Sequence, residues 1–182
     1  MKCPNCGYEL RRQSRESIPQ ETLEKATGNL CYVVWMLNKM PTLIFKPNSQ
    51  PENNAFIESF VIHARILIEF LHGDERNDTF FASDYCSNWK RPLKEEDFLL
   101  EIKRKANKMG AHLTATGVMM DNKDWPVIEI RDKLNKEIEE FLDDENTKIT
   151  EEKKKAIKKI MKSQIQFMGV TCPTGPAEPF KN

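Results

Sequence analysis

Histidine and arginine, the residue types suited to proton transfer and phosphate binding, gather in one short stretch of this 182-residue chain. His63, Arg65 and His72 lie close together, and the third histidine, His112, follows in the segment Ala-His-Leu-Thr. A histidine changes its charge near neutral pH, and an arginine binds phosphate oxygens through two parallel hydrogen bonds. These four residues are therefore the candidate catalytic residues for acid–base chemistry on an anionic substrate.

The same stretch carries acidic residues at helical spacing. Glu58, Arg65, Glu69 and His72 follow one another at steps of seven, four and three residues, so they share one face of a helix. Arg65 can pair with Glu69 one turn later and with Glu58 two turns earlier. His63 projects from a different face. A structural ion pair of Glu58, Arg65 and Glu69 is thus the alternative to a catalytic Arg65, because buried charges require partners.

A helix predicted over residues 54–72 positions these side chains. It is apolar on nearly every side, and such a helix usually forms the buried centre of a domain. No apolar run in the chain reaches the length of a membrane span, and the ionisable residues of this helix would be costly in lipid. The helix is therefore expected to be the central helix of a soluble domain.

Apolar residues recur at three- and four-residue steps in four further stretches, a pattern that predicts helices. The first is expected to end at Pro41, because proline lacks the N–H group of a helical hydrogen bond, and a loop is expected over 45–53. The further helices are expected over 21–40, 95–109, 126–142 and 150–168, with a short helix starting near Ser83. The prediction is an all-α fold, a helical bundle of four to five main helices.

Three segments of different character follow from this pattern. Residues 1–19 form a short N-terminal appendage that contains a Cys-x-x-Cys motif, and residues 20–169 form the helical bundle domain. Residues 170–182 contain three prolines and are expected to be a flexible tail.

The N-terminal motif consists of Cys3 and Cys6, whose spacing lets both thiolates bind one metal ion. It resembles one half of a zinc-ribbon module, which implies a structural Zn²⁺ site. Such a site needs four ligands, and Cys31, Cys86 and Cys172 form no second pair. Three hypotheses remain open. Two chains share one zinc at a dimer interface, or Cys172 and one further residue complete the site, or the pair binds no metal.

The charge composition argues against a dedicated nucleic-acid or membrane protein. The 28 basic and 28 acidic residues cancel, whereas such proteins usually carry a basic excess. An acidic run over 137–145 and a lysine-rich run over 153–162 are expected to be solvated helix faces. No secretion signal is apparent at the start of the sequence. A cytoplasmic location is expected, where the five cysteines stay reduced.

Arg65 and His72, separated by six residues, resemble the R-x4-6-H motif of HEPN-type ribonucleases. These are small helical bundles that usually act as dimers. The resemblance implies that Arg65 stabilises phosphate charge and that His72 transfers a proton, in a metal-independent ribonuclease. In this chain Ile66 follows the arginine, where the family commonly has a polar residue, and the motif lies in an earlier helix than is usual in the family.

A longer stretch, 54–116, is similar to a group of uncharacterised small helical prokaryotic proteins. The shared features are a His-x-Arg-x-Leu-x-x-Phe helix that begins at His63 and a later His-Leu-Thr that begins at His112. No activity is implied by this resemblance. It does imply that His63, Arg65, Asp84 and His112 come together in space as one cluster.

Two functions of different class follow from the sequence. The favoured hypothesis is a soluble, non-enzymatic helical module, zinc-linked if Cys3 and Cys6 bind metal, with a structural polar seam in its central helix. The alternative is a HEPN-like RNA-cleaving or RNA-binding protein of a defence or toxin type. The expected partners are a second copy of the chain and RNA, and no membrane.

Overall fold

The computed structural model describes residues 18–73, 79–109 and 124–162. Within these ranges all regular structure is helical, and there is no strand. The helices are α1 (Gln20–Ile44), α2 (Gln50–His72), α3 (Ala82–Tyr85), α4 (Phe98–Met109), α6 (Val127–Asp143) and α7 (Glu151–Lys162). The predicted all-α bundle is confirmed, since five of these helices have 12 or more residues. The Cys-x-x-Cys motif and the tail 170–182 lie outside the described residues.

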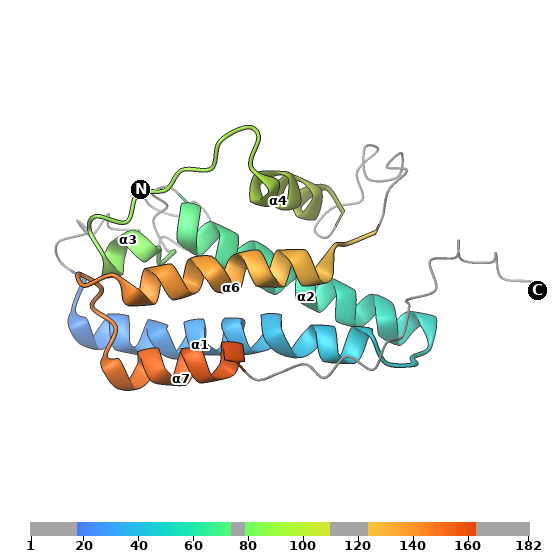
Figure 1. The fold of residues 1–182 in the computed structure, drawn as a ribbon, viewed down its shortest axis with the longest axis horizontal. Helices are drawn as coiled ribbons and strands as arrows, with labels where there is room; N and C mark the ends of the chain where they lie inside the picture. The colour runs from blue at the N-terminus through green and yellow to red at the C-terminus, as the bar shows by residue number, and fades with distance from the viewer. Residues whose placement is uncertain (1–17, 74–78, 110–123, 163–182) are drawn as a thin grey trace, which may run out of the picture.

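The five long helices form a bundle in which α1 and α2 pack against each other (Figure 1). α7 lies along α1, α6 covers the α1–α2 pair, and α4 lies against α2 on the side away from α1. α2 contacts α1, α3, α4 and α6, so it is the central helix of the bundle. Among the described residues, no helix has the length and apolarity needed to cross a membrane.

α1 continues past Pro41 and ends at Ile44, so the prediction that Pro41 ends this helix is wrong. The proline stands in the last turn, where its missing N–H removes only one helical hydrogen bond. Pro41 and Ile44 are both buried, and their apolar contacts favour the extra turn. The helix end is then closed by the Phe45 N–H, which donates to Pro41 O (3.2 Å), and by the Asn48 amide, which donates to Leu43 O (2.6 Å).

α2 begins at Gln50, four residues earlier than expected, so the loop between α1 and α2 is shorter than the predicted 45–53. The Glu52 carboxylate accepts hydrogen bonds from the Ser49 hydroxyl (2.8 Å) and the Ser49 backbone N–H (2.9 Å). These two bonds hold the pKa of Glu52 below its usual value. Ser-x-x-Glu is a capping pattern, and Pro51 suits a first helical turn. The earlier start could therefore have been predicted from the sequence.

α2 ends at His72, as predicted, and Gly73 follows it. A Cβ atom at position 73 would lie 2.5 Å from the ring of Phe81. It would also lie 2.3 Å from the backbone oxygen of Glu69, so the end of α2 and the Phe81 ring together leave room only for glycine.

Aromatic rings fill the core where α2, α3 and α6 meet. The Phe141 ring lies edge-on to Phe70, Trp89 and Tyr85, with centroid distances of 5.4, 5.3 and 6.3 Å. The Trp89 indole N–H donates to Leu71 O (2.9 Å). Buried aromatic rings contribute large apolar areas and prefer such edge-to-face contacts. They attach the short helix α3 and the segment after it to the bundle.

α1 and α6 are joined by a pair of amides inside the interface. Asn38 is buried, and its Nδ2 donates to Asn135 Oδ1 (3.0 Å) and to Val34 O (2.9 Å). In return Asn135 Nδ2 donates to Asn38 Oδ1 (2.8 Å). Each amide therefore satisfies the other, which a buried polar group requires.

We expect Asn135→Ala to lower the free energy of unfolding by about 1–3 kcal/mol, because the buried Asn38 amide loses both its donor and an acceptor. In the double variant Asn38→Ala, Asn135→Ala, the further loss of unfolding free energy should be smaller than this, since no amide is then left unsatisfied. Urea denaturation of the two single variants and the double variant measures this. Additive losses would show that the two amides do not interact.

Candidate functional site

His72, a candidate catalytic residue, is sealed in the structure. Its side chain is 5% exposed, with Nε2 2.5 Å from Glu137 Oε2 on α6 and Nδ1 2.6 Å from the backbone oxygen of Arg91. Both ring nitrogens of His72 therefore lie at hydrogen-bond distance from oxygen atoms of the protein. His72 therefore acts as a clamp between the end of α2, α6 and the segment that precedes α4.

Charged groups around this clamp are themselves paired. The Arg91 guanidinium lies over the Trp89 ring, 4.0 Å from its centroid, and also contacts the Glu140 carboxylate. Lys133 Nζ lies 4.0 Å from the second oxygen of Glu137. Neither ring nitrogen of His72 is available to a substrate in this arrangement.

Arg65 lies on α2 and is half-buried. Throughout the ranges that the structure describes, it makes no hydrogen bond or ion pair. Glu69 instead pairs with Lys103 of α4, with Nζ 2.7 Å from Oε2, and Glu58 is exposed. Within the described ranges no ion pair joins Arg65 to Glu58 or Glu69, and Glu69 pairs with Lys103 instead. Helical spacing allowed the Arg65–Glu69 contact, but the cation that reaches Glu69 comes from a neighbouring helix.

His63 and Asp84, expected in one cluster with Arg65 and His112, have separate surroundings. His63 Nδ1 lies 2.6 Å from Ser59 O, and the imidazole ring packs edge-on against the Tyr32 ring of α1, with a centroid distance of 5.7 Å. Asp84 is buried, and its Oδ2 accepts the Phe81 N–H (2.8 Å) at the start of α3. Asp84 therefore helps to form the short helix α3.

Three further predicted residues, His112, Cys3 and Cys6, lie outside the described residues. The Zn²⁺ site therefore stays a prediction. Within the described ranges there is no group of three or more His, Cys, Asp or Glu side chains that could hold a metal ion.

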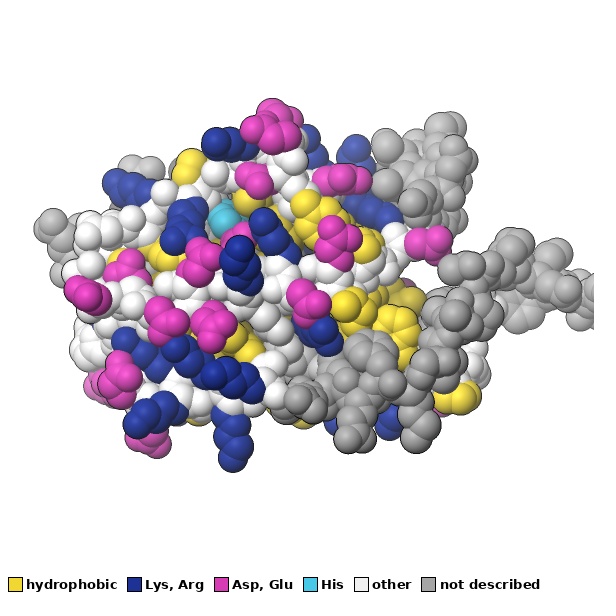
Figure 2. Space-filling model, in the orientation of Figure 1, with side chains coloured by type: hydrophobic (Ala, Val, Ile, Leu, Met, Phe, Trp, Pro, Cys, Tyr) yellow, Lys and Arg dark blue, Asp and Glu magenta, His cyan; other side chains and the backbone are white. Residues whose placement is uncertain are grey.

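The acidic and lysine-rich runs lie on α6 and α7, where side chains of opposite charge are interleaved (Figure 2). Lys154 pairs with Glu151 (2.8 Å), and Lys158 of α7 pairs with Asp143 of α6. An interface that follows nucleic-acid phosphates needs a surface dominated by positive charge. This face is instead a mixture of both signs.

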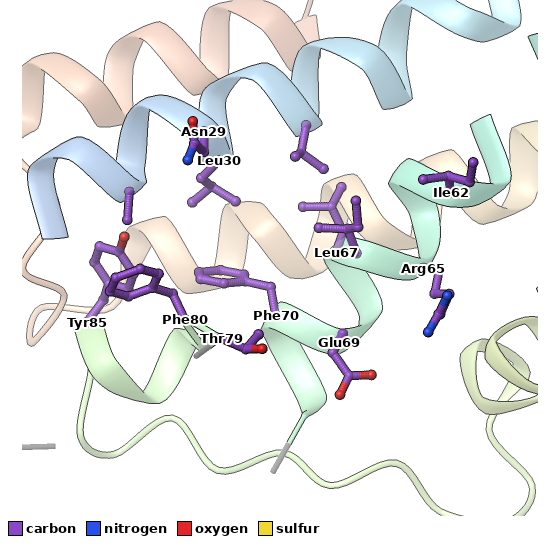
Figure 3. A pocket seen from close by; sticks show the side chains of 13 residues that line it. Asn29, Leu30, Ile62, Arg65, Leu67, Glu69, Phe70, Thr79, Phe80 and Tyr85 are labelled. Carbon is purple, nitrogen blue, oxygen red and sulfur yellow. The ribbon is translucent and has the colours of Figure 1, made fainter. Parts of the chain in front are cut away.

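A groove of about 510 Å³ lies between α1 and α2 and reaches α3. Figure 3 shows apolar side chains from the three elements around it, with Arg65 and Glu69 at its α2 edge. Leu30, Leu67, Phe70 and Tyr85 form the buried part of the lining. The groove is lined by Ala26, Asn29, Leu30, Val33, Ile62, Arg65, Ile66, Leu67, Glu69, Phe70, Thr79, Phe80 and Tyr85.

Tyr85 closes the α3 end of this groove. Its hydroxyl donates to Leu23 O of α1 (3.0 Å), and burial raises its pKa above the usual value. A phenol whose proton is held in this way is a poor base at neutral pH. Tyr85 therefore serves as a structural wall of the groove.

Large apolar side chains stand exposed beside the groove. Ile62 (50% exposed), Ile66 (46%) and Phe80 (36%) line it. On α1 the exposed Tyr32 ring contacts His63 of α2 and also the exposed Trp35 ring, the latter with a centroid distance of 6.2 Å. We call these five residues, Tyr32, Trp35, Ile62, Ile66 and Phe80, the apolar face. They include every exposed large apolar side chain of the described ranges.

The apolar face was not predicted from the sequence. A helix that is apolar on nearly every side was expected to be covered on every side, yet α2 leaves the edge with Ile62 and Ile66 exposed. Comparison with known protein families, curated proteins and solved structures gives no match.

We expect His72→Ala to lower the free energy of unfolding by about 3–5 kcal/mol, because it leaves the Glu137 carboxylate without its main partner in a largely buried place. Chemical denaturation of His72→Ala, Glu137→Ala and the double variant should give a coupling energy of at least about 1 kcal/mol. Lys25→Ala, which breaks an exposed pair with Glu21, is the control and should cost less than about 1 kcal/mol. A coupling energy near zero would contradict the clamp.

Proposed function

We propose that this protein is a non-enzymatic helical interaction module that binds a protein partner through the apolar face. The observation that carries the proposal is the position of Ile62, Ile66 and Phe80, which are exposed and line one groove, with the exposed Tyr32 ring packed against His63 of the neighbouring helix α2. Single exposed apolar residues are ordinary on soluble proteins, whereas contiguous patches mark interaction sites. Three of the five, Tyr32, Trp35 and Phe80, are aromatic residues, a class enriched at protein interfaces.

The groove supports a protein partner rather than a small polar substrate. Its lining is predominantly apolar, and its charged members, Arg65 and Glu69, both stand at the α2 edge. A recess between two helices, bordered by protruding isoleucine and aromatic side chains, suits the apolar face of another helix. The bundle beneath it is rigidly joined by the His72 clamp and the aromatic core, so the surface is presented in a fixed shape.

The RNA-cleaving alternative retains one supporting observation. Arg65 stands at the edge of an open groove, and no acidic side chain of the described residues pairs with it. The same proposal needs His72 to transfer a proton to or from substrate, and His72 is 5% exposed with both ring nitrogens at hydrogen-bond distance from protein acceptors. The interaction module requires neither residue to reach a substrate.

The interaction module is tested by photo-crosslinking in cells that make the protein. A photoreactive phenylalanine analogue replaces Ile66 on the apolar face or, as control, Ala156, an exposed residue of α7. We expect a crosslinked adduct from position 66 and none from position 156. The protein in the adduct, once purified, should bind the wild-type chain at least about tenfold more tightly than Ile66→Glu, because a charge then enters an apolar contact.

Ala156→Glu adds the same charge to another exposed helix position and should leave this binding unchanged. Both variants should keep the wild-type free energy of unfolding within about 0.5 kcal/mol, as surface substitutions usually do. Equal crosslinking from the two positions would refute the proposal. Binding of the purified partner that is equally tight with Ile66→Glu would refute it as well.

RNA cleavage separates the enzymatic alternative from the module. We expect purified wild type, Arg65→Ala and Arg65→Lys to leave single-stranded RNA equally intact. A ribonuclease whose arginine stabilises the charge that develops on the phosphate should lose about 10²–10³-fold of its rate when that arginine is removed. Cleavage by wild type that falls to this extent in Arg65→Ala would favour the ribonuclease. Arg65 is a better choice than His72 here, because its replacement disturbs no described ion pair.

A further inference from the structure

Two opposite charges stand on the same edge of α2 as the exposed isoleucines. Glu58 is exposed and Arg65 is half-buried, and the residues described by the structure supply no ion-pair partner for either. They are seven residues apart, which places them on one side of the helix, two turns from each other. Ile62, which is 50% exposed, lies between them. This edge thus presents an acid, an apolar side chain and a base in a row.

Such a row is complementary to itself when two helices run antiparallel. A two-fold axis at Ile62 places position 58 of one helix opposite positions 65 and 66 of the other, because residues on either side of the axis exchange places. Glu58 then meets the partner's Arg65, and Arg65 meets the partner's Glu58. The two Ile62 side chains meet at the axis. Both charges find an opposite charge, and no like charges are brought together.

We propose that the partner bound by the apolar face is a second copy of this chain, joined through an antiparallel α2–α2 contact centred on Ile62; this rests on the proposed function. Tyr32 of α1, which is exposed and whose ring contacts His63 of α2, adds aromatic area beside this helix. The polar seam expected from the sequence thus forms between two chains, with Glu58 and Arg65 as its members.

The remaining charge on this edge does not oppose the contact. Glu69 pairs with Lys103 of its own chain, with 2.7 Å between Nζ and Oε2. In the antiparallel arrangement the residue opposite Glu69 is Ala55 of the partner subunit, which is small and uncharged. A second copy therefore meets no uncompensated repulsion at either end of the contact, whereas an unrelated helix would need its own matching pattern of charges.

The contact is tested by charge reversal in the full chain, measured by sedimentation at micromolar concentration. We expect wild type to form dimers. Glu58→Arg brings two arginines together at each end of the contact, and Arg65→Glu brings two glutamates together. The dimer dissociation constant of each variant alone should therefore be at least about tenfold higher than that of wild type. Ile62→Glu should have the same effect, and Ala156→Glu should have none.

Mixing the two reversed chains is the decisive step. A chain with Glu58→Arg meets a chain with Arg65→Glu through opposite charges at both ends, so the mixture should form dimers although neither variant does so alone. The doubly reversed chain, with both substitutions, should dimerise within about threefold of wild type. If Glu58 and Arg65 acted only within their own chain, mixing the two reversed chains would not restore dimers.

The outcomes separate this inference from the proposed function. EDTA is present throughout, so that a zinc-linked dimer through Cys3 and Cys6 does not contribute. A wild-type chain that stays monomeric overturns the second copy as partner, while a crosslink from position 66 to a different protein keeps the interaction module. Dimers that ignore Ile62→Glu and both charge reversals overturn the α2 contact. If the wild-type chain forms no dimer and position 66 gives no crosslink, both proposals are overturned.

Discussion

The packing of α2 determines where the candidate residues His63, Arg65 and His72 lie. One side of α2 buries Phe60, Ala64, Leu67, Ile68 and Leu71 against the neighbouring helices. Burial of side chains of this size is the dominant favourable term in folding, so it sets the rotation of the helix about its axis. With that rotation fixed, His72 turns toward α6, Glu69 toward α4, and Ile62 and Ile66 toward solvent.

The helical class and the main helices could be predicted because local pattern determines them. The repeat of Leu23, Leu30, Val34 and Leu37 indicates a helix that buries one side, and all four are buried. The ends of α1 and α2 were less well predicted for two different reasons. Proline usually ends a helix, but the burial of Pro41 outweighs this preference, and no local sequence pattern reveals that burial. The Ser49–Glu52 cap, in contrast, was visible in the sequence.

The partners of the charged residues could not be predicted, because spacing along one helix says nothing about the helices that face it. Glu69 pairs with Lys103, and His72 binds Glu137, both from elements later in the chain. An exposed pair within one helix is worth only a few tenths of a kcal/mol. A partner from a neighbouring helix that is held in place by the core therefore displaces it easily.

The apolar face shows a related limit of the sequence pattern. Ile62 and Ile66 have the same residue type as buried isoleucines such as Ile68, so composition alone cannot tell a core position from an interface position. The charged residues next to the exposed isoleucines, Glu58 and Arg65, distinguish the two kinds of position. A charge at the edge of a core has to find a partner within its own chain, because burying it alone is costly. Glu58 and Arg65 have none among the described residues, and they border the exposed isoleucines. In the dimer that we propose, a second copy of this strip supplies the counter-charges to Glu58 and Arg65.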